Sequence, residues 1–311
     1  MKKLLIFLLL PLQVLAQKFS KEEIKRWEAQ AQQVTIIRDN WGIPHVYGKT
    51  DADAVFGLMY AQCEDDFKRV EMNYIEKLGR LSELKGESEL YNDLQIRLII
   101  DSAEAVADYN KAAPWLKKLL NAYADGLNYY LYKNPQVKPA LLTRFKPWYP
   151  LLWTDGSIGA ISTGGLSISE LKNFYTGGNE FSAAIKPEIE DLPSGSNGFA
   201  IAPSKTESGK AILYINPHVT FYFRPEVQVS SQEGLNAYGA VTWGQFFVYQ
   251  GFNDYCGWMH TSSQVDVADM YAEKVIKKGN QYFYEYNKAL KPVTQKQITI
   301  RYRDGEVMKS K

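Results

Sequence analysis

Apolar residues in the first half of the chain recur at the spacing of a helix face. Between residues 51 and 84 they follow one another mostly at intervals of three or four, with Gly79 and Gly86 as breaks, and this spacing predicts a long helix. The positions are Ala54, Leu58, Ala61, Phe67, Val70, Tyr74, Leu78 and Leu81.

Three shorter stretches complete the first half. Residues 20–32 open with an N-cap serine and an acidic first turn, which indicates an exposed helix. Residues 103–133 read as further helix, interrupted once by a proline. A β-like run at 34–38 is followed by a loop that returns to another run within 41–47. We therefore expect the chain to be mostly helical up to about residue 180.

The pattern changes after the turn-rich stretch at residues 191–198. From there, short apolar runs alternate with turn residues, which predicts a β-rich second half and, with the helical first half, an α+β fold class. The expected runs are residues 199–202, 211–215, 227–230, 240–243, 246–249, 257–260 and 270–275.

Composition and charge narrow the classes of function. The 311 residues carry 36 Lys and Arg against 35 Asp and Glu, a net charge of +1 that speaks against a nucleic-acid partner. Hydrophobic residues make up 45%, enough for a sizeable core, and the length suits about two domains. Strand-like alternation at 297–302 lies just before the last residue, so we expect the second half to continue beyond residue 311.

The first residues have the pattern of an export signal. Two lysines precede an apolar run from Leu4 to Leu15, and the small Ala16 follows, so residues 1–16 are predicted to be a signal peptide cleaved after Ala16. A membrane anchor is the alternative, but the run is shorter than a span and contains a proline. We expect a periplasmic or secreted protein without a membrane span. In an oxidising compartment Cys63 and Cys256 could form a disulfide, and free thiols fit equally well.

Candidate chemistry is confined to a few polar positions. The three histidines show no zinc-ligand spacing, and the chain has neither a G-x-S-x-G elbow nor a phosphate-binding glycine loop. What remains is Gly195-Ser196-Asn197, which leads directly into a predicted strand, with Asn216-Pro217-His218 on the next one. Taken alone, such a serine is usually an ordinary turn residue.

Several stretches together resemble the penicillin acylase family of N-terminal-nucleophile (Ntn) hydrolases. The resemblance implies the four-layer αββα Ntn-hydrolase fold, an α-chain over residues 17–170, a spacer over 171–195, and an incomplete β-chain over 196–311, paired as a heterodimer cut from one precursor. The matching stretches are Arg38 to Val46, Tyr60 to Asp65, Ala122 to Asn128, Gly195 to Asn197, Asn216 to His218, Gly251 to Asn253 and Trp258 to Thr261.

By this resemblance the precursor cuts itself between Gly195 and Ser196. Gly195 has no Cβ and tolerates a strained conformation beside the scissile carbonyl, which the Ser196 hydroxyl would attack. The freed α-amine has an ordinary pKa near 7.7–8.0, so it can take the hydroxyl proton, and Ser196 becomes nucleophile and base together. The implied reaction is hydrolysis of a small-molecule acyl amide whose amine product is a homoserine lactone, a β-lactam nucleus or a related group.

The resemblance also implies the residues around the nucleophile. His218 would orient the Ser196 amine and hydroxyl, as family members carry Gln or His there; a histidine that caps a turn after Pro217 is the alternative. One oxyanion donor would be the backbone N–H of Ser262. The second donor in the family is an asparagine far downstream of the nucleophile, which would lie beyond residue 311.

Calcium is the implied cofactor. Asp266 and Asp269 have the spacing by which family members hold the ion, with the carbonyl of Ala268 between them and Glu170 from the other chain. Two solvated loop aspartates are the alternative. His45 and His260 fit structural positions. The aromatic residues Phe221, Tyr222, Phe223 and Phe247 are candidates for an acyl pocket or simply core.

A second function class stays open from the sequence. The same fold could serve as an exported binding protein without catalysis, or this segment could be inactive. Processing at Gly195-Ser196 distinguishes the two classes.

Overall fold

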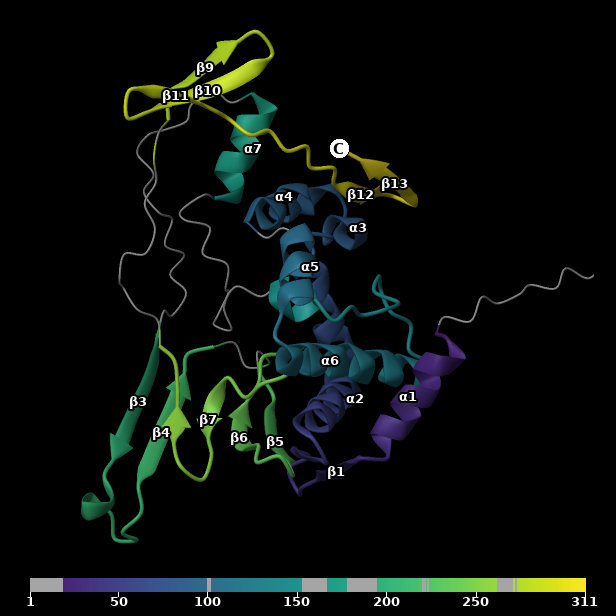
Figure 1. Ribbon diagram of the computed structural model, residues 1–311, viewed down its shortest axis with the longest axis vertical. Coiled ribbons are helices and arrows are strands. Elements are labelled where there is room, and N and C mark those ends of the chain that lie inside the picture. Colours follow the sequence, from purple (N-terminus) through teal and green to yellow (C-terminus); the bar gives the residue numbers. More distant parts are fainter. Residues whose placement is uncertain are drawn as a thin grey trace, which may run out of the picture.

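The computed structural model describes residues 19–99, 102–152, 167–177, 195–219, 222, 224–261, 271 and 273–311. Helices predominate in the first half of this part and strands in the second, so the expected α+β class with a mostly helical N-terminal segment is confirmed (Figure 1). The helical elements are α1 (Lys21–Ala31), α2 (Asp51–Lys77), α3 (Ser82–Lys85), η1 (Glu87–Glu89), α4 (Leu90–Ile99), α5 (Ser102–Lys111), α6 (Pro114–Lys133), η2 (Tyr149–Leu152) and α7 (Ile168–Thr176).

Local signals in the sequence explain where these helices begin and end. The Ser20 hydroxyl accepts a hydrogen bond from the Glu23 N–H, and the Glu23 carboxylate accepts one from the Ser20 N–H. Together the two bonds form a capping box for α1. Pro114 stands at the start of α6, where its missing N–H is not needed. The expected helix over 51–84 is divided after α2, where Gly79 has a positive φ of 59°.

The helices α2 and α6 form the centre of the core. Gly126 of α6 faces α2 so closely that a Cβ there would lie 2.5 Å from the carbonyl oxygen of Phe56. Trp27, Tyr74 and Tyr123 are fully buried in the same cluster. At Asp66 the backbone of α2 leaves helical angles, and the Asp66 carboxylate caps the second part by accepting from the Arg69 N–H at 3.0 Å.

Six of the described strands form one sheet that draws on both halves of the chain. Its order is β1-β2-β5-β6-β7-β8, antiparallel except where β2 pairs in parallel with β5. A second apolar cluster, with Val46 from β2, Leu58 from α2 and Val227 from β5, joins α2 to this sheet. The strands are β1 (Val34–Arg38), β2 (Pro44–Gly48), β5 (Glu226–Ser231), β6 (Asn236–Ala240), β7 (Gln250–Phe252) and β8 (Gly257–Trp258).

Residues 246–249 are not a strand. The prediction was wrong there, because Val248 and Phe246 belong to a loop that packs its apolar side chains against the two core clusters before β7 begins at Gln250. An apolar run thus marks burial in this region without marking strand pairing.

The strands β3 (Ser196–Ile201) and β4 (Ile212–Pro217) form a separate antiparallel pair, here called the β3–β4 ribbon. Figure 1 shows it in green beside β7, away from α2 and α6. Two close approaches connect it to the end of the main sheet. A Cβ on Gly257 would lie 2.3 Å from a methyl carbon of Leu213, and a Cβ on Gly198 would overlap the sulfur of Met259.

Two small sheets complete the C-terminal part. One contains β9 (Val275–Lys278), β10 (Gln281–Tyr286) and β11 (Ala289–Pro292); the other contains β12 (Arg301–Asp304) and β13 (Val307–Ser310). The β12–β13 pair is attached to the helices, since Ile300 packs with Leu90 and Leu94 and the Ser82 hydroxyl donates to the Arg301 carbonyl at 2.9 Å. None of the helices described has both the length and the apolar character needed to cross a bilayer.

Candidate active site around Ser196

Ser196 is the first residue of β3, at the end of the β3–β4 ribbon. The residue before it, Gly195, has a φ of +140°, a conformation that favours glycine. The Ser196 hydroxyl donates a hydrogen bond to the Gly195 carbonyl oxygen at 2.8 Å. The hydroxyl therefore lies beside the carbonyl group of the Gly195–Ser196 peptide bond, the predicted cleavage site.

A second residue holds the backbone of Ser196. Thr261 Oγ1 accepts from the Ser196 N–H at 2.9 Å and donates to the Ser196 carbonyl oxygen at 3.0 Å. One threonine hydroxyl thus satisfies both backbone groups of Ser196. Thr261 is the last residue of the family-like stretch from Trp258 to Thr261. The sequence pattern did not indicate a role for its side chain.

His218 is brought to the same end of the ribbon. The register of the β3–β4 ribbon sets Ser196 opposite Pro217 and Asn197 opposite Asn216, so His218 follows the residue that faces the serine. The register therefore places Gly195, Ser196 and His218 at the same end of the ribbon. Ser262, the predicted oxyanion donor, follows Thr261 but lies outside the described residues, as do Asp266, Ala268 and Asp269.

A stacked group supports the segment that leads to Thr261. The His260 ring stacks on Tyr249 with centroids 4.4 Å apart, and the Arg224 guanidinium lies 4.3 Å from the centroid of the same tyrosine. Gln250 joins the group by donating to the His260 carbonyl at 2.9 Å and accepting from Arg224 at 2.6 Å. Burial lowers the pKa of Arg224 from its ordinary value. This arrangement agrees with a structural position for His260.

Glu170 lies in a helix cap. It is the third residue of α7, and its Oε2 accepts from the N–H and the hydroxyl of Ser167, each at 2.8 Å. Across the described ranges, no group of three or more His, Cys, Asp or Glu side chains is arranged to hold a metal ion. The other predicted calcium ligands lie in residues 262–270, which are not described.

Two of the four acyl-pocket candidates, Tyr222 and Phe247, lie among the described residues. Phe221 and Phe223 lie outside the described residues, and Tyr222 is exposed with its ring beneath Arg69 at 5.5 Å. Phe247 lines a cavity of about 360 Å³ together with Trp258, but Ser196 does not line it. This cavity is therefore not identified as the acyl pocket.

The matching stretches of the helical half serve as scaffold. Arg38 pairs with Asp65 at 2.8 Å and Glu64 at 3.2 Å, which fixes β1 against α2. Gln62 donates to the Gln245 carbonyl and accepts from the Gly244 N–H, both at 2.8 Å. The two hydrogen bonds of Gln62 hold the loop between β6 and β7 against α2.

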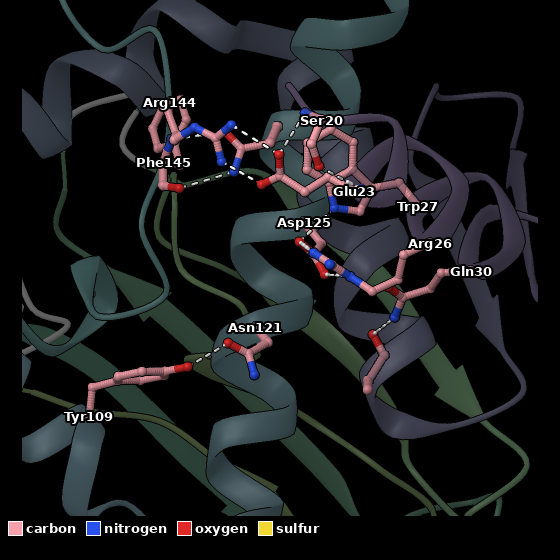
Figure 2. A network of polar contacts seen from close by, with 12 residues as sticks. Ser20, Glu23, Arg26, Trp27, Gln30, Tyr109, Asn121, Asp125, Arg144 and Phe145 are labelled. Carbon is pink, nitrogen blue, oxygen red and sulfur yellow. Dashed lines mark hydrogen bonds and ion pairs between the residues drawn. The ribbon is translucent and has the colours of Figure 1, made fainter. Parts of the chain in front are cut away.

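The stretch from Ala122 to Asn128 ties α6 to its neighbours. Asp125 accepts from Arg26 and from the Trp27 indole N–H, both at 2.6 Å, and Figure 2 shows this contact beside the Glu23–Arg144 ion pair. The hydrogen bonds from Arg144 hold the pKa of Glu23 at about 2. The family-like stretches of the helical half thus contribute packing and ion pairs, whereas the candidate residues Ser196 and His218 lie on or next to the β3–β4 ribbon.

Both cysteines are free thiols in the structure. Cys63 is buried within α2, and Cys256 is exposed beside β8. Burial raises the pKa of the Cys63 thiol well above its ordinary value. The sequence left a Cys63–Cys256 disulfide and two free thiols as alternatives, and the structure shows the free thiols.

Two curated acylases are among the proteins similar to this chain. The chain is 24% identical over 316 residues to an acyl-homoserine lactone acylase QuiP of Pseudomonas fluorescens, covering 86% of this chain and 38% of that protein. It is 25% identical to a penicillin acylase 2 proenzyme of Pseudomonas sp. strain SE83, covering 88% and 41%. The chain therefore spans about two fifths of the length of these curated relatives.

The chain also matches a solved structure and a protein family. A thermostable penicillin G acylase from Alcaligenes faecalis is similar over 39% of this chain and 69% of its own, with 21% identity and a TM-score of 0.35. Residues 33–310 match the family described as penicillin amidase, which is most of the chain. The chain belongs to the penicillin amidase family.

Proposed function

We propose that the protein is an autoproteolytically processed N-acyl amide hydrolase whose nucleophile is Ser196. The observation that carries the proposal is the 2.8 Å hydrogen bond from the Ser196 hydroxyl to the carbonyl oxygen of Gly195, in a residue pair whose glycine has a φ of +140°. This hydrogen bond keeps the hydroxyl beside the carbonyl group that it would attack in the proposed processing step.

In the processing step, Ser196 Oγ attacks the Gly195 carbonyl carbon. The C–N bond to Ser196 breaks as the hydroxyl proton passes to the departing nitrogen, and an ester links Gly195 to Oγ. Water then hydrolyses the ester, which leaves a carboxylate on Gly195 and a free hydroxyl and amine on Ser196. The same amine takes the hydroxyl proton when Oγ attacks a substrate amide, and passes it to the substrate nitrogen as the C–N bond breaks and the amine product leaves. Water then hydrolyses the acyl-enzyme ester, which releases the acid and restores the Ser196 hydroxyl.

The neighbouring residues have supporting roles in this proposal. The backbone N–H of Ser262 donates to the oxyanion, and His218 orients the Ser196 amine and hydroxyl. The position of His218 after the residue opposite Ser196 supports this role. The substrate class is suggested by relatives named for acyl-homoserine lactones and for penicillin, so both kinds of acyl amide are proposed substrates.

The proposed processing produces two chains, residues 17–170 and a chain that begins at Ser196, with residues 171–195 as spacer and 1–16 removed on export. The parallel pairing of β2 with β5 supports a stable heterodimer, because residues from both chains then share one sheet. Their shared backbone hydrogen bonds and buried cluster would hold the two products together after the cut.

A structural calcium ion is part of the proposal, with Glu170, Asp266, Asp269 and the carbonyl of Ala268 as ligands. Glu170 fits this role because the helix cap uses its Oε2, and its Oε1 offers a hard oxygen ligand. When bound, the ion would link the end of the first chain at Glu170 to the segment after Thr261. Removal by a chelator should lower the melting temperature or slow processing, and indifference to chelation would remove the claim.

The nucleophile is tested in protein expressed from the complete gene. Wild-type protein should give a chain beginning at Ser196 by intact mass and N-terminal analysis, and should hydrolyse acyl amides from a panel of acyl-homoserine lactones and phenylacetyl amides. Ser196→Ala should abolish both cleavage and hydrolysis. A wild-type chain that stays intact across Gly195 and Ser196 would instead indicate a binding protein without catalysis.

A further inference from the structure

The Thr261 hydroxyl makes two bonds to one residue. It accepts from the Ser196 N–H at 2.9 Å and donates to the Ser196 carbonyl oxygen at 3.0 Å. A hydroxyl has one hydrogen to donate and two lone pairs to accept, so both bonds can exist at once. Thr261 therefore pairs with Ser196 as the backbone of a neighbouring strand would.

We propose that Thr261 is the positioning residue for the Ser196 nitrogen, first in the precursor peptide bond and afterwards in the free amine. This inference rests on the proposed function of Ser196. The nitrogen that Thr261 holds is the atom that changes from amide to amine when the chain is cut. The threonine oxygen can accept a hydrogen bond from either form, so the contact need not change during processing.

This contact fixes the backbone from which the nucleophile projects. The N–H and the carbonyl of Ser196 lie on either side of its Cα, and holding both restricts the backbone rotations that would carry the side chain away from Gly195. The threonine also lies on the glycine side, since a Cβ on Gly195 would be 3.9 Å from Thr261 Oγ1. In the processed enzyme, the same restraint would keep the amine beside Oγ, where it must take the proton.

Thr261 is itself held by its surroundings. Its neighbour His260 stacks on Tyr249, and the His260 carbonyl accepts from Gln250. Met259 fills the space above Gly198 of β3, which presses the segment against the ribbon. A positioning contact is effective only when its support is rigid, and these contacts supply that support.

The test compares Thr261→Val with Thr261→Ser in protein from the complete gene, with Ser196→Ala measured beside them. Valine has nearly the shape of threonine but lacks the hydroxyl, whereas serine keeps the hydroxyl. We expect Thr261→Val to slow the cut by about 10²-fold and to lower kcat by a similar factor, with KM changed less than about twofold. Thr261→Ser should restore both rates to within a few fold of wild type.

The outcomes separate this inference from the proposed function. If Thr261→Val cuts and turns over like wild type while Ser196→Ala does neither, the role of Thr261 is refuted and the nucleophile stands. If Ser196→Ala still cuts or turns over, the proposed function itself fails. Equal losses in the valine and serine variants, with a lowered melting temperature, would show that Thr261 only supports the fold. Thr261→Ala serves as a second variant, and unfolding of both apolar variants would likewise overturn the inference.

Discussion

The α2–α6 helix pair and the β3–β4 ribbon are stabilised in different ways. Helices α2 and α6 contain many buried residues, among them the fully buried Leu58 and Tyr123. In β3 and β4 no residue is buried, and the ribbon is held by single contacts such as those of Thr261 and Met259. The proposed chemistry thus lies on a ribbon without a buried residue, where a few polar contacts decide the geometry.

The largest expected effect on stability is in the helical core. Glu71 of α2 is 2% exposed and accepts hydrogen bonds from the backbone N–H groups of Ala140, Leu141 and Leu142 at 2.9, 2.7 and 2.7 Å. Glu71→Ala leaves these donors without their acceptor, so we expect a loss of about 3 kcal/mol in the free energy of unfolding. Urea denaturation of the uncut Ser196→Ala protein measures it.

The matched control for this experiment is Glu64→Ala on the same helix. Glu64 is partly exposed and its pair with Arg38 is 3.2 Å long, so we expect a change below about 1 kcal/mol. Equal effects of the two substitutions would show that the buried carboxylate is not what holds the segment at residues 140–142. The same substitutions should leave the contacts of the ribbon unchanged.

An intermediate effect is expected at the entrance to α1, and it depends on pH. Hydrogen bonds from Arg144 hold the pKa of Glu23 at about 2, below its ordinary value of 4.5. A carboxyl group whose pKa is lowered by folding stabilises the fold above the unfolded pKa, and this contribution is lost as the pH falls from about 4.5 through about 2.

Glu23→Gln tests this contribution while keeping a side chain that can complete the capping box. We expect it to destabilise the protein by about 1 kcal/mol at pH 7, since the group is partly exposed to solvent. The difference from the parent should shrink below pH 4.5 and vanish near pH 2, provided that both proteins still fold. Glu22→Gln, in the same first turn, is the control. A difference that stays constant with pH would contradict the assignment to the charged pair.

The helical elements were predictable because their signals are local. The Ser20 and Glu23 capping box, the proline at the start of α6 and the break at Gly79 all act within a few residues of the chain. Gly195, Ser196 and His218 could also be singled out, because their stretches resemble a known family. The structure added that the ribbon register sets them at one end of two strands.

Other features could not be predicted because they depend on distant parts of the chain. The parallel pairing of β2 with β5 joins residues such as Val46 and Val229, which are far apart in sequence. The apolar run at 246–249 looked like a strand, yet it packs as a loop. The bonds of Thr261 join a side chain to a backbone 65 positions away, and no spacing rule encodes that kind of contact.

The smallest expected effect distinguishes the ribbon from the core directly. Phe199 and Tyr214 face each other across β3 and β4, and their rings stack with centroids 4.8 Å apart. Both rings are about half exposed, so Tyr214→Ala should weaken the ribbon by about 0.5–1 kcal/mol. In the uncut Ser196→Ala protein, hydrogen exchange at the amides of β3 should then be about two to five times faster, while exchange in α2 stays the same. Tyr255→Ala, at a ring that is 95% exposed, is the control and should change neither. If the amides of α2 accelerate together with those of β3, the ribbon and the helical core open as one unit, and the distinction between the two regions does not hold.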